Sequence, residues 1–416
     1  MRLRKRGRPT PAAVAAILAL VLARVCLAEA SPPIFQFHAF GSLALTHSSE
    51  NQADFLGSLL IRHGAGYTQS WSAEVDSRLG AQLAVTLTPK ISAVVQVLAE
   101  QGHDGNYTPL LEWANVAYHP TTDASVRVGR IVLPTFMVSD SRKVGYANAW
   151  VRPPGEVYGL VPITSNDGVD ASYRAHFGTS ELTLQGIYGQ SDTKIPAGGV
   201  ARAREVWGVT ATAENGPGQV RFAYEQTRLT IDTYNRLFDG FRQFGPEGLA
   251  IARRFDADGS ILQFVGAGGL YDPGGWFVMG ELGLMRSPSA VGEHLAWYAS
   301  GGYRFGPVTP YVTYSAIAAR SARSDPGLNP AAYPPAQAGA IASLNGALDR
   351  LLAASVVQNT ISFGVRWDFR KNLDCKLQLD HSRRGAGSPG TLGNIQPGFR
   401  PGGQYDVVSL AVDFVY

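Results

Sequence analysis

The 416-residue sequence is poor in cysteine, methionine and long apolar runs. It has 2 cysteines, and Cys26 lies near the N-terminus in a leader-like segment, so Cys375 alone remains beyond it. A single cysteine cannot form an intrachain disulfide, which excludes a small disulfide-stapled fold. Beyond the leader no stretch approaches the roughly 18 apolar residues that a spanning helix needs. A soluble β-protein or a barrel of alternating strands remains open.

The first 30 residues have the layout of a secretory signal peptide. MRLRKRG is a basic segment, an apolar stretch broken by Arg24 follows it, and AEA supplies small residues before SPP. This order predicts cleavage after Ala30, with a retained membrane anchor as the alternative. Cys26 lacks the small residues that should precede a lipoprotein cysteine. We therefore expect residues 1–30 to be a leader and 31–416 to be the exported domain.

A positive charge excess is also missing once the leader is set aside. The whole chain has 36 Lys and Arg against 33 Asp and Glu, and the leader holds six of the former and one of the latter. The remaining chain therefore carries 30 basic and 32 acidic residues, although the whole sequence has a pI of about 8.8. This balance gives no reason to expect nucleic acid as a partner.

Period-2 alternation of apolar and polar residues is abundant in the chain. In LGAQLAVTLT every second residue from Leu79 to Leu87 is apolar, and QNTISFGVRWDF repeats the pattern from Ile361 to Phe369. Alternation of this kind is typical of strands with one apolar face. Ten residues at about 3.3 Å each and ~45° tilt rise about 23 Å, close to the apolar band of an outer membrane. The runs that fit are 34–46, 79–88, 91–101, 110–119, 124–130, 167–178, 181–189, 205–214, 219–228, 260–271, 276–286, 295–305, 309–318, 358–369, 373–383 and 405–416.

The connections between these runs alternate between short and long without exception. After every even-numbered run stand two to four turn-forming residues, such as PK, NGPG and DPGG. After the odd-numbered runs the connections extend from eight residues at 102–109 to thirty-nine at 319–357. A sandwich has no reason to keep every long loop at one end, whereas transmembrane barrels have short periplasmic turns and long extracellular loops. The sequence therefore predicts an all-β, transmembrane antiparallel β-barrel of about 16 strands in a Gram-negative outer membrane.

The chain ends on a strand with an apolar face, QYDVVSLAVDFVY. Because a barrel has no free edge, this last strand is expected to pair with the first run. Its terminal aromatic residue then lies at the periplasmic interface, where aromatic girdles occur. A strand that ends this way resembles the signal read by the barrel-assembly machinery. Phe414 and Tyr416 are the predicted assembly signal, although Phe is the usual last residue.

The strand plan as a whole resembles that of Gram-negative outer-membrane porins. The segments WSAEVDSRLGAQ, VRVGRIVLPTFMVSDSRKVGYANAWVRPP and DGVDASY are similar to a poorly characterised porin-like group. The resemblance implies a passive aqueous channel for ions and small hydrophilic solutes. It implies a homotrimer, contacts with outer-membrane lipid and lipopolysaccharide, and a pore narrowed by the third long loop. In strand order that loop is 131–166. It lacks the acidic-aromatic-glycine motif of enteric porins, so their pore carboxylates cannot be assigned here.

Loop 131–166 is the predicted constriction. Pro153 and Pro154 restrict its second half, which suits a loop held in one place. Arg142 and Arg152 are the leading candidates for the narrowest point, and the alternative is that they pin the loop to acidic residues of the wall. Three cations against two acids favour a weak anion preference. The candidate residues are Asp140, Arg142, Lys143, Arg152 and Glu156.

The polar faces of the strands are expected to line the lumen, because a lipid-facing charge near the midplane costs roughly 2–4 kcal/mol. Inward charges either set up a field across the pore or pair with one another in a wet interior. The candidates are Asp170, Arg174, Arg221, Glu225, Arg304, Arg366, Asp368, Lys376, Asp380 and Asp413.

The other motifs favour neither catalysis nor a cofactor. His381 and Ser382 are adjacent in a strand and face opposite sides, so they cannot act as a nucleophile and base. No His or Cys cluster has metal-ligand spacing, and neither an enzyme activity nor a cofactor or metal is expected.

In loop 319–357, Ile341, Leu344 and Leu348 recur at helical spacing and predict a short helix over the barrel mouth. The main alternative function is a barrel-anchored adhesin or receptor that uses its long loops.

Overall fold

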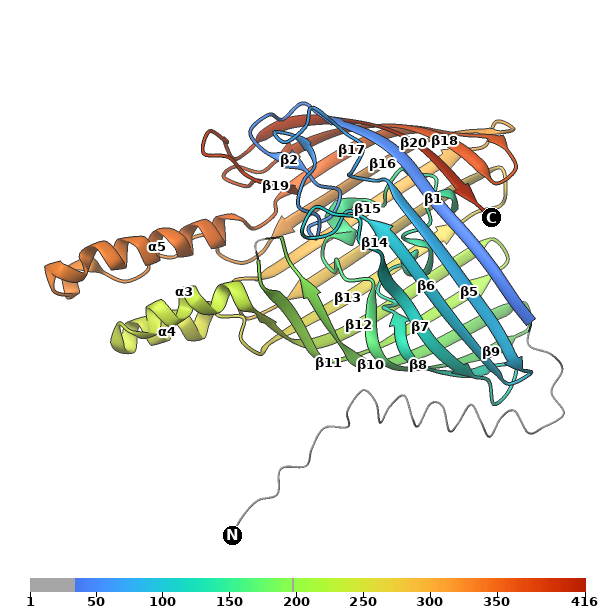
Figure 1. The fold of residues 1–416 in the computed structure, drawn as a ribbon, viewed down its shortest axis with the longest axis horizontal. Helices are drawn as coiled ribbons and strands as arrows, with labels where there is room; N and C mark the ends of the chain where they lie inside the picture. The colour runs from blue at the N-terminus through green and yellow to red at the C-terminus, as the bar shows by residue number, and fades with distance from the viewer. Residues whose placement is uncertain (1–33, 197) are drawn as a thin grey trace, which may run out of the picture.

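The protein is described by a computed structural model that covers residues 34–196 and 198–416. Within them, sixteen long antiparallel strands form a closed barrel (Figure 1). Each predicted run corresponds to one of these strands, which confirms the predicted fold class. The strands are β1 (Ile34–Ser48), β5 (Arg78–Thr88), β6 (Ile91–Glu100), β7 (Leu110–Tyr118), β8 (Ala124–Val132), β9 (Ser165–Phe177), β10 (Ser180–Lys194), β11 (Val200–Asn215), β12 (Gly218–Ile231), β13 (Ser260–Tyr271), β14 (Trp276–Arg286), β15 (Glu293–Tyr303), β16 (Val308–Ala319), β17 (Gln358–Arg370), β18 (Leu373–Arg384) and β20 (Gly403–Val415).

The first and last long strands close the barrel. β1 pairs with β5 on one side and with β20 on the other, so neither has a free edge. The pairing continues through the last residue, because the amide of Tyr416 donates to the carbonyl oxygen of Ala39 at 2.7 Å. The terminal strand thus finds the partner that the sequence predicted.

One predicted loop is wrong. Residues 190–204 are mostly strand, because β10 continues to Lys194 and β11 already begins at Val200. The cause is an irregularity in each strand. The register shifts between Gly189 and Ser191 of β10, and between Arg204 and Trp207 of β11, where Glu205 has a φ of 51°. A bulge reverses the parity of alternation, so the pattern on the two sides of Glu205 does not read as one strand.

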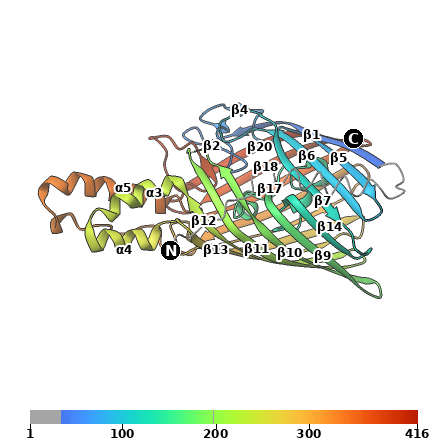
Figure 2. The same cartoon turned by 60° about the horizontal axis from the view of Figure 1, so that its bottom comes forward.

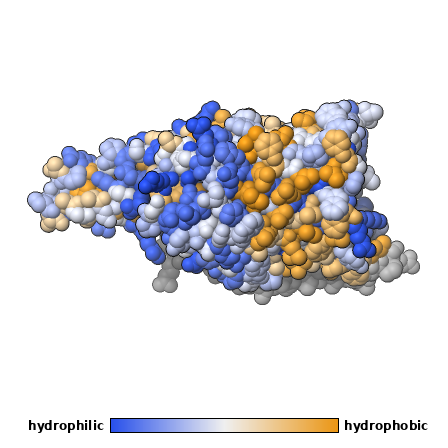
Figure 3. Space-filling view, turned by 90° about the horizontal axis from the view of Figure 1, so that it is seen from above, coloured by the Kyte–Doolittle hydropathy of each residue, from blue (hydrophilic) through white to orange (hydrophobic). Residues whose placement is uncertain are grey.

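The outer face of the barrel is apolar. Leu282, Trp297 and Phe363 alternate with buried residues on their strands and are 40–54% exposed. Figure 3 shows apolar side chains gathered over the barrel wall, while hydrophilic ones dominate nearer the helical end. This distribution fits strands that meet lipid around the middle of the barrel.

Three helices extend from one end of the barrel (Figures 1 and 2). They are α3 (Asp232–Arg242), α4 (Gly245–Phe255) and α5 (Ala338–Ala353), and they share an apolar core that includes Phe238, Phe241 and Ile341. Of these three helices, the sequence pattern predicted only the one within 319–357. That helix packs beside α3 and projects away from the barrel instead of lying over its mouth, because its apolar stripe meets α3. No helix in the described residues has the length and apolar character needed to cross a membrane.

Two other long connections are joined at the same end. Residues 49–77 contribute β2 (Asp54–Phe55), β3 (Ala65–Gly66) and β4 (Trp71–Ser72), and residues 385–402 contribute β19 (Leu392–Gly393). β19, β2 and β3 form a small sheet. The fully buried carboxylate of Asp54 fastens it by accepting from the Thr68 amide at 2.8 Å and from the Asn394 side chain at 2.7 Å.

The connection between β8 and β9 folds into the barrel. It contains η1 (Ser139–Ser141), η2 (Gly145–Ala147) and the short helix α2 (Gly155–Tyr158). Its apolar residues share one buried cluster with inward-facing residues of β10 to β16. We call residues 131–166 the inner loop.

Candidate pore constriction

The inner loop is anchored on one side by aromatic packing. Trp150 is 3% exposed, and its indole N–H lies 3.0 Å from both Ser300 Oγ and Thr313 Oγ1. Its ring meets Tyr298 edge-on with 5.7 Å between centroids. Phe136 packs in a similar way against Phe264. Aromatic side chains bury large areas, so these contacts fix the loop against β13, β15 and β16.

Two buried carboxylates of the barrel wall bind the same side of the loop, and neither is paired with a cation. Glu225 accepts a hydrogen bond from the Thr135 hydroxyl at 2.9 Å. Glu281 accepts from the Met137 amide at 2.8 Å and from the hydroxyls of Tyr158 and Tyr298. Neither carboxylate forms an ion pair within the described part of the chain. Both therefore act as acceptors for neutral donors of the loop and the wall.

Cations of the wall bind backbone carbonyls of the loop. The Arg221 guanidinium donates to the Phe136 carbonyl at 2.6 Å, and Arg366 donates to the carbonyls of Tyr146 at 2.6 Å and Asn148 at 3.0 Å. The fully buried ammonium of Lys376 donates to the Gly145 carbonyl at 2.7 Å while it pairs with Asp413 at 2.7 Å. These candidate lumen residues point inward, and their partner is the inner loop.

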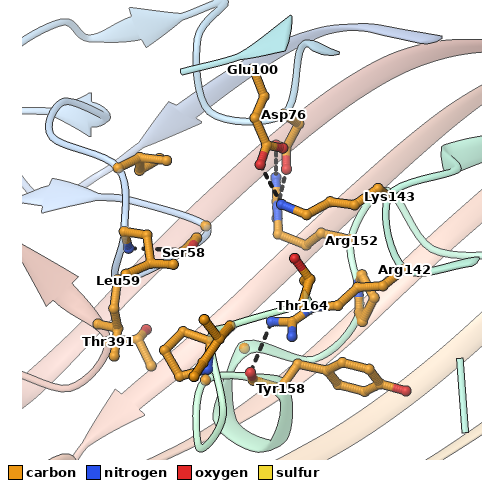
Figure 4. A pocket seen from close by; sticks show the side chains of 18 of the residues that line it. Ser58, Leu59, Asp76, Glu100, Arg142, Lys143, Arg152, Tyr158, Thr164 and Thr391 are labelled. Carbon is orange, nitrogen blue, oxygen red and sulfur yellow. Dashed lines mark hydrogen bonds and ion pairs between the residues drawn. The ribbon is translucent and has the colours of Figure 1, made fainter. Parts of the chain in front are cut away.

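Arg152 lies in a network of acids. Its guanidinium is 8% exposed and pairs with Asp76 at 2.6 Å (Figure 4). It also pairs with Asp380 at 3.1 Å. It also donates to Ser409 Oγ, and the Phe55 ring stacks 4.8 Å away. Burial opposes ionisation of Asp76, but the attraction of Arg152 prevails and lowers the pKa of that carboxyl. Arg152 thus joins the inner loop to β18, to β20 and to the first long connection.

Lys143 and Arg142 are adjacent in sequence but have different partners (Figure 4). Lys143 pairs with Glu100, and Arg78 Nε lies 3.9 Å from the same carboxylate. Arg142 donates to the carbonyls of Tyr158 at 2.8 Å and Val161 at 3.1 Å. In the residues that the structure describes it has no carboxylate partner. Burial lowers the pKa of Arg142 to about 10, so the group stays charged near neutrality.

The two acidic candidates of the loop also differ. Glu156 is 4% exposed and accepts from Ser315 at 2.8 Å, from Gln358 at 2.7 Å and from Thr360. Asp140 is exposed. Glu156 therefore joins the loop to β16 and β17, whereas Asp140 faces open space.

The remaining lumen candidates form ion pairs with residues outside the inner loop. Asp170 is buried and pairs with Arg127, while Asp368 pairs with Arg366 at 2.7 Å. Arg174 pairs with Glu181 near the β9–β10 turn at 2.8 Å. Arg304 lies in the turn after β15, outside the strand predicted for it, because β15 ends at Tyr303. There it binds Asp272 of the neighbouring turn at 2.7 Å.

Several residues that hold the loop were missed in the sequence. Glu281 shares the inward face of β14 with Phe277 and Met279, so the same alternation rule applies to it. Asp76 belongs to a long connection, where no periodicity indicates which way a side chain points. Glu100 is the last residue of β6. Strand pattern alone could therefore have found Glu281 but not Asp76.

A cavity of about 470 Å³ lies between the inner loop, residues 55–61 and the neighbouring wall. Arg142, Lys143 and Arg152 line it together with Asp76 and Glu100 (Figure 4). No group of three His, Cys, Asp or Glu in the described residues is arranged to hold a metal ion.

Comparison with known proteins gives one family and many solved structures. The profile of the Gram-negative porin family matches residues 12–406. No protein of curated function matches the sequence.

Among solved structures, the outer-membrane channel DcaP of Acinetobacter baumannii is 12% identical, with a TM-score of 0.55 over 93% of this chain and 99% of that one. The anion-selective porin of Comamonas acidovorans is 12% identical, with a TM-score of 0.53 over 92% and 100%. The trimer form of Vibrio cholerae OmpT is 10% identical, with a TM-score of 0.52 over 93% and 100%. At these identities the structures show a shared fold.

Proposed function

The chain belongs to the Gram-negative porin family, and from that premise we propose that its inner loop forms the constriction of the channel. The protein is a passive outer-membrane channel for small solutes, and the family match favours this over a barrel-anchored adhesin. A sixteen-strand barrel encloses a lumen too wide to select solutes by its walls alone. Some segment must narrow it.

The observation that carries the proposal is the attachment of the inner loop on opposite sides of the lumen. On one side, the Thr135 hydroxyl and the Phe136 carbonyl bind Glu225 and Arg221 of β12. On the other, Lys143 pairs with Glu100 of β6, and the Gly145 carbonyl accepts from Lys376 of β18, both far from β12 in the strand order. A segment bound to strands on opposite sides of the barrel wall is stretched across the interior. Its charged residues then lie where permeating ions pass within a few ångströms of them, and such charges act more strongly than distant ones that salt screens within ~8–10 Å.

We further propose a weak anion preference. Arg142 is a loop cation without a carboxylate partner in the described residues, whereas Arg152 is neutralised by Asp76 and Asp380. The structurally similar Comamonas acidovorans protein is described as anion-selective. The preference in this chain would then depend on Arg142 more than on Arg152.

The proposal extends to assembly and location. Residues 1–30 would be removed on export, a segment that lies outside the described residues. Phe414 and Tyr416 would act as the signal for the barrel-assembly machinery, since Tyr416 is 79% exposed and lies near the Phe37 ring, with 6.4 Å between centroids. The barrel would sit among lipid and lipopolysaccharide as a homotrimer, an assembly that the Vibrio cholerae relative adopts in its trimer form.

Planar-bilayer recording of the refolded protein tests the constriction. Replacing residues 140–152 with a Gly/Ser segment of equal length removes Trp150 and Arg152 at constant chain length, so single-channel conductance should rise. Replacing residues 239–247 of the helical extension in the same way is the matched control, and conductance should not change. Equal conductance of both variants, in correctly folded channels, would show that the inner loop does not narrow the pore.

A further inference from the structure

The cavity beside the inner loop combines an apolar wall with a cationic wall. Residues 59–61 (Leu-Leu-Ile) and 162–163 (Pro-Ile) supply apolar surface, and Arg78, Arg142 and Lys143 supply positive charge. In Figure 4, Leu59 lies across the cavity from Arg142. Its volume of about 470 Å³ falls within the roughly 300–1,000 Å³ of small-molecule sites, which are mostly apolar with a few polar groups that orient the ligand.

Most charges around the cavity pair with one another. Arg152 is occupied by Asp76 and Asp380, and Lys143 and Arg78 share Glu100. Glu156 lines the cavity too, but its oxygens accept hydrogen bonds from neutral donors of β16 and β17. These groups have little free capacity to hold a solute.

Arg142 is different because its partners are carbonyl oxygens. Two of its terminal N–H groups donate to Tyr158 and Val161, and a guanidinium has five N–H donors in all. Glu112 also lines this part of the cavity. The whole lining holds six Lys and Arg against seven Asp and Glu, so the cavity has no overall positive excess. The cation available to a solute is Arg142 itself, which forms no ion pair in the described residues. A planar guanidinium with free donors fits a carboxylate better than it fits a neutral group.

We propose that this cavity binds small amphipathic monocarboxylates on their way through the channel, a proposal that rests on the channel function above. The carboxylate binds the free N–H donors of Arg142. The apolar body lies against Leu59 and the rest of residues 59–61, and against residues 162–163, where it displaces water from apolar surface. Small inorganic anions lack that body and pass without being held.

Concentration-dependent block of single-channel current tests the site. Benzoate is the probe, acetate tests the need for an apolar body, and benzylamine reverses the charge on a similar ring. Benzoate should block at the lowest concentration. Arg142→Gln should raise its half-blocking concentration about tenfold, because a charge-assisted hydrogen bond is lost. Leu59→Ser should weaken benzoate block while leaving acetate unaffected.

Matched controls separate this site from the channel itself. Arg304→Gln removes a cation at the β15–β16 turn and should leave benzoate block unchanged. Conductance in KCl alone reports channel function, so a conducting protein without benzoate block would overturn the binding site and leave the channel intact. Unchanged block in Arg142→Gln channels of normal conductance would overturn the role of Arg142. If that variant fails to fold, Leu59→Ser decides, and calorimetry of benzoate with refolded wild-type protein in detergent measures binding without conduction.

Discussion

Two arcs of the barrel wall contact the same inner loop through different kinds of interaction. From β12 to β16 the contacts are aromatic packing and hydrogen bonds that belong to no ion pair in the described residues, with Trp150, Glu281 and Arg221 as examples. From β17 through β20 to β1 the contacts are buried charges, centred on Lys376 and Arg152. The first arc excludes water, and the second compensates desolvated charges with one another.

The difference implies different sensitivity to single substitutions. A packed aromatic side chain loses contacts in proportion to the atoms removed. A buried ion pair that loses one partner leaves the other charge desolvated and uncompensated, which is costly even where the intact pair contributes little net stability. The charged arc should therefore be the more fragile of the two.

The largest effect is expected for Lys376→Met. This variant leaves the buried Asp413 with the Ser42 hydroxyl in place of an ammonium group, so the free energy of unfolding should fall by about 3–5 kcal/mol. Equilibrium unfolding in urea of barrels refolded into lipid vesicles measures it. Arg304→Met, which breaks a half-exposed pair with Asp272, is the control and should cost about 1 kcal/mol or less. Similar losses of free energy of unfolding for both variants would contradict the expectation that removing one partner of a buried ion pair is especially destabilising.

A smaller effect is expected for Trp150→Phe on the apolar arc. The substitution keeps an aromatic ring but removes the indole N–H that lies 3.0 Å from Ser300 Oγ and Thr313 Oγ1. Those two hydroxyls remain 2.7 Å apart and can still bond to each other. The free energy of unfolding should therefore be lower than that of the wild type by only about 1–3 kcal/mol. The same urea titration measures it. A loss as large as that of Lys376→Met would remove the distinction between the arcs.

Acid should loosen the charged arc before the apolar one. Arg152 lowers the pKa of Asp76 below 3.8, so the stability from this pair is present above pH 3.8 and is lost as the pH falls through the lower, folded value. Channel noise from loop motion should therefore stay constant from neutral pH to about pH 4 and increase below it. Asp76→Asn should show the increased noise at neutral pH and lose this acid-dependent step. An onset near pH 6 in the wild type would assign the step to another group.

The sequence predicts much of this arrangement because strand parity is a local property. Inward positions such as Lys376 and Asp413 follow from alternation along a single strand. What lies opposite them does not, since Ser42 and Asp413 are 371 residues apart in the chain. The pattern therefore indicated a wet lumen, while the structure shows Lys376 bound to the inner loop and Asp413 paired with Lys376. Helices α3 and α4 were missed although Tyr234, Phe238 and Phe241 recur at helical spacing.

The smallest effect concerns ion selectivity, where Arg142→Gln and Arg152→Gln are compared. Both variants remove one positive charge from the inner loop. In Arg152→Gln the buried acids Asp76 and Asp380 lose their shared cation, and one of them is expected to take up a proton, which restores much of the local balance. Arg142 has no such neighbours in ion-pair contact among the described residues. At 8 Å in water one unit charge contributes about 0.5 kcal/mol, or about a twofold change in local anion concentration. Reversal potential under a KCl gradient should therefore shift toward cations by about that factor in Arg142→Gln and by less in Arg152→Gln. A larger shift in Arg152→Gln would show that ion selectivity depends on Arg152, the cation paired with Asp76 and Asp380, more than on Arg142.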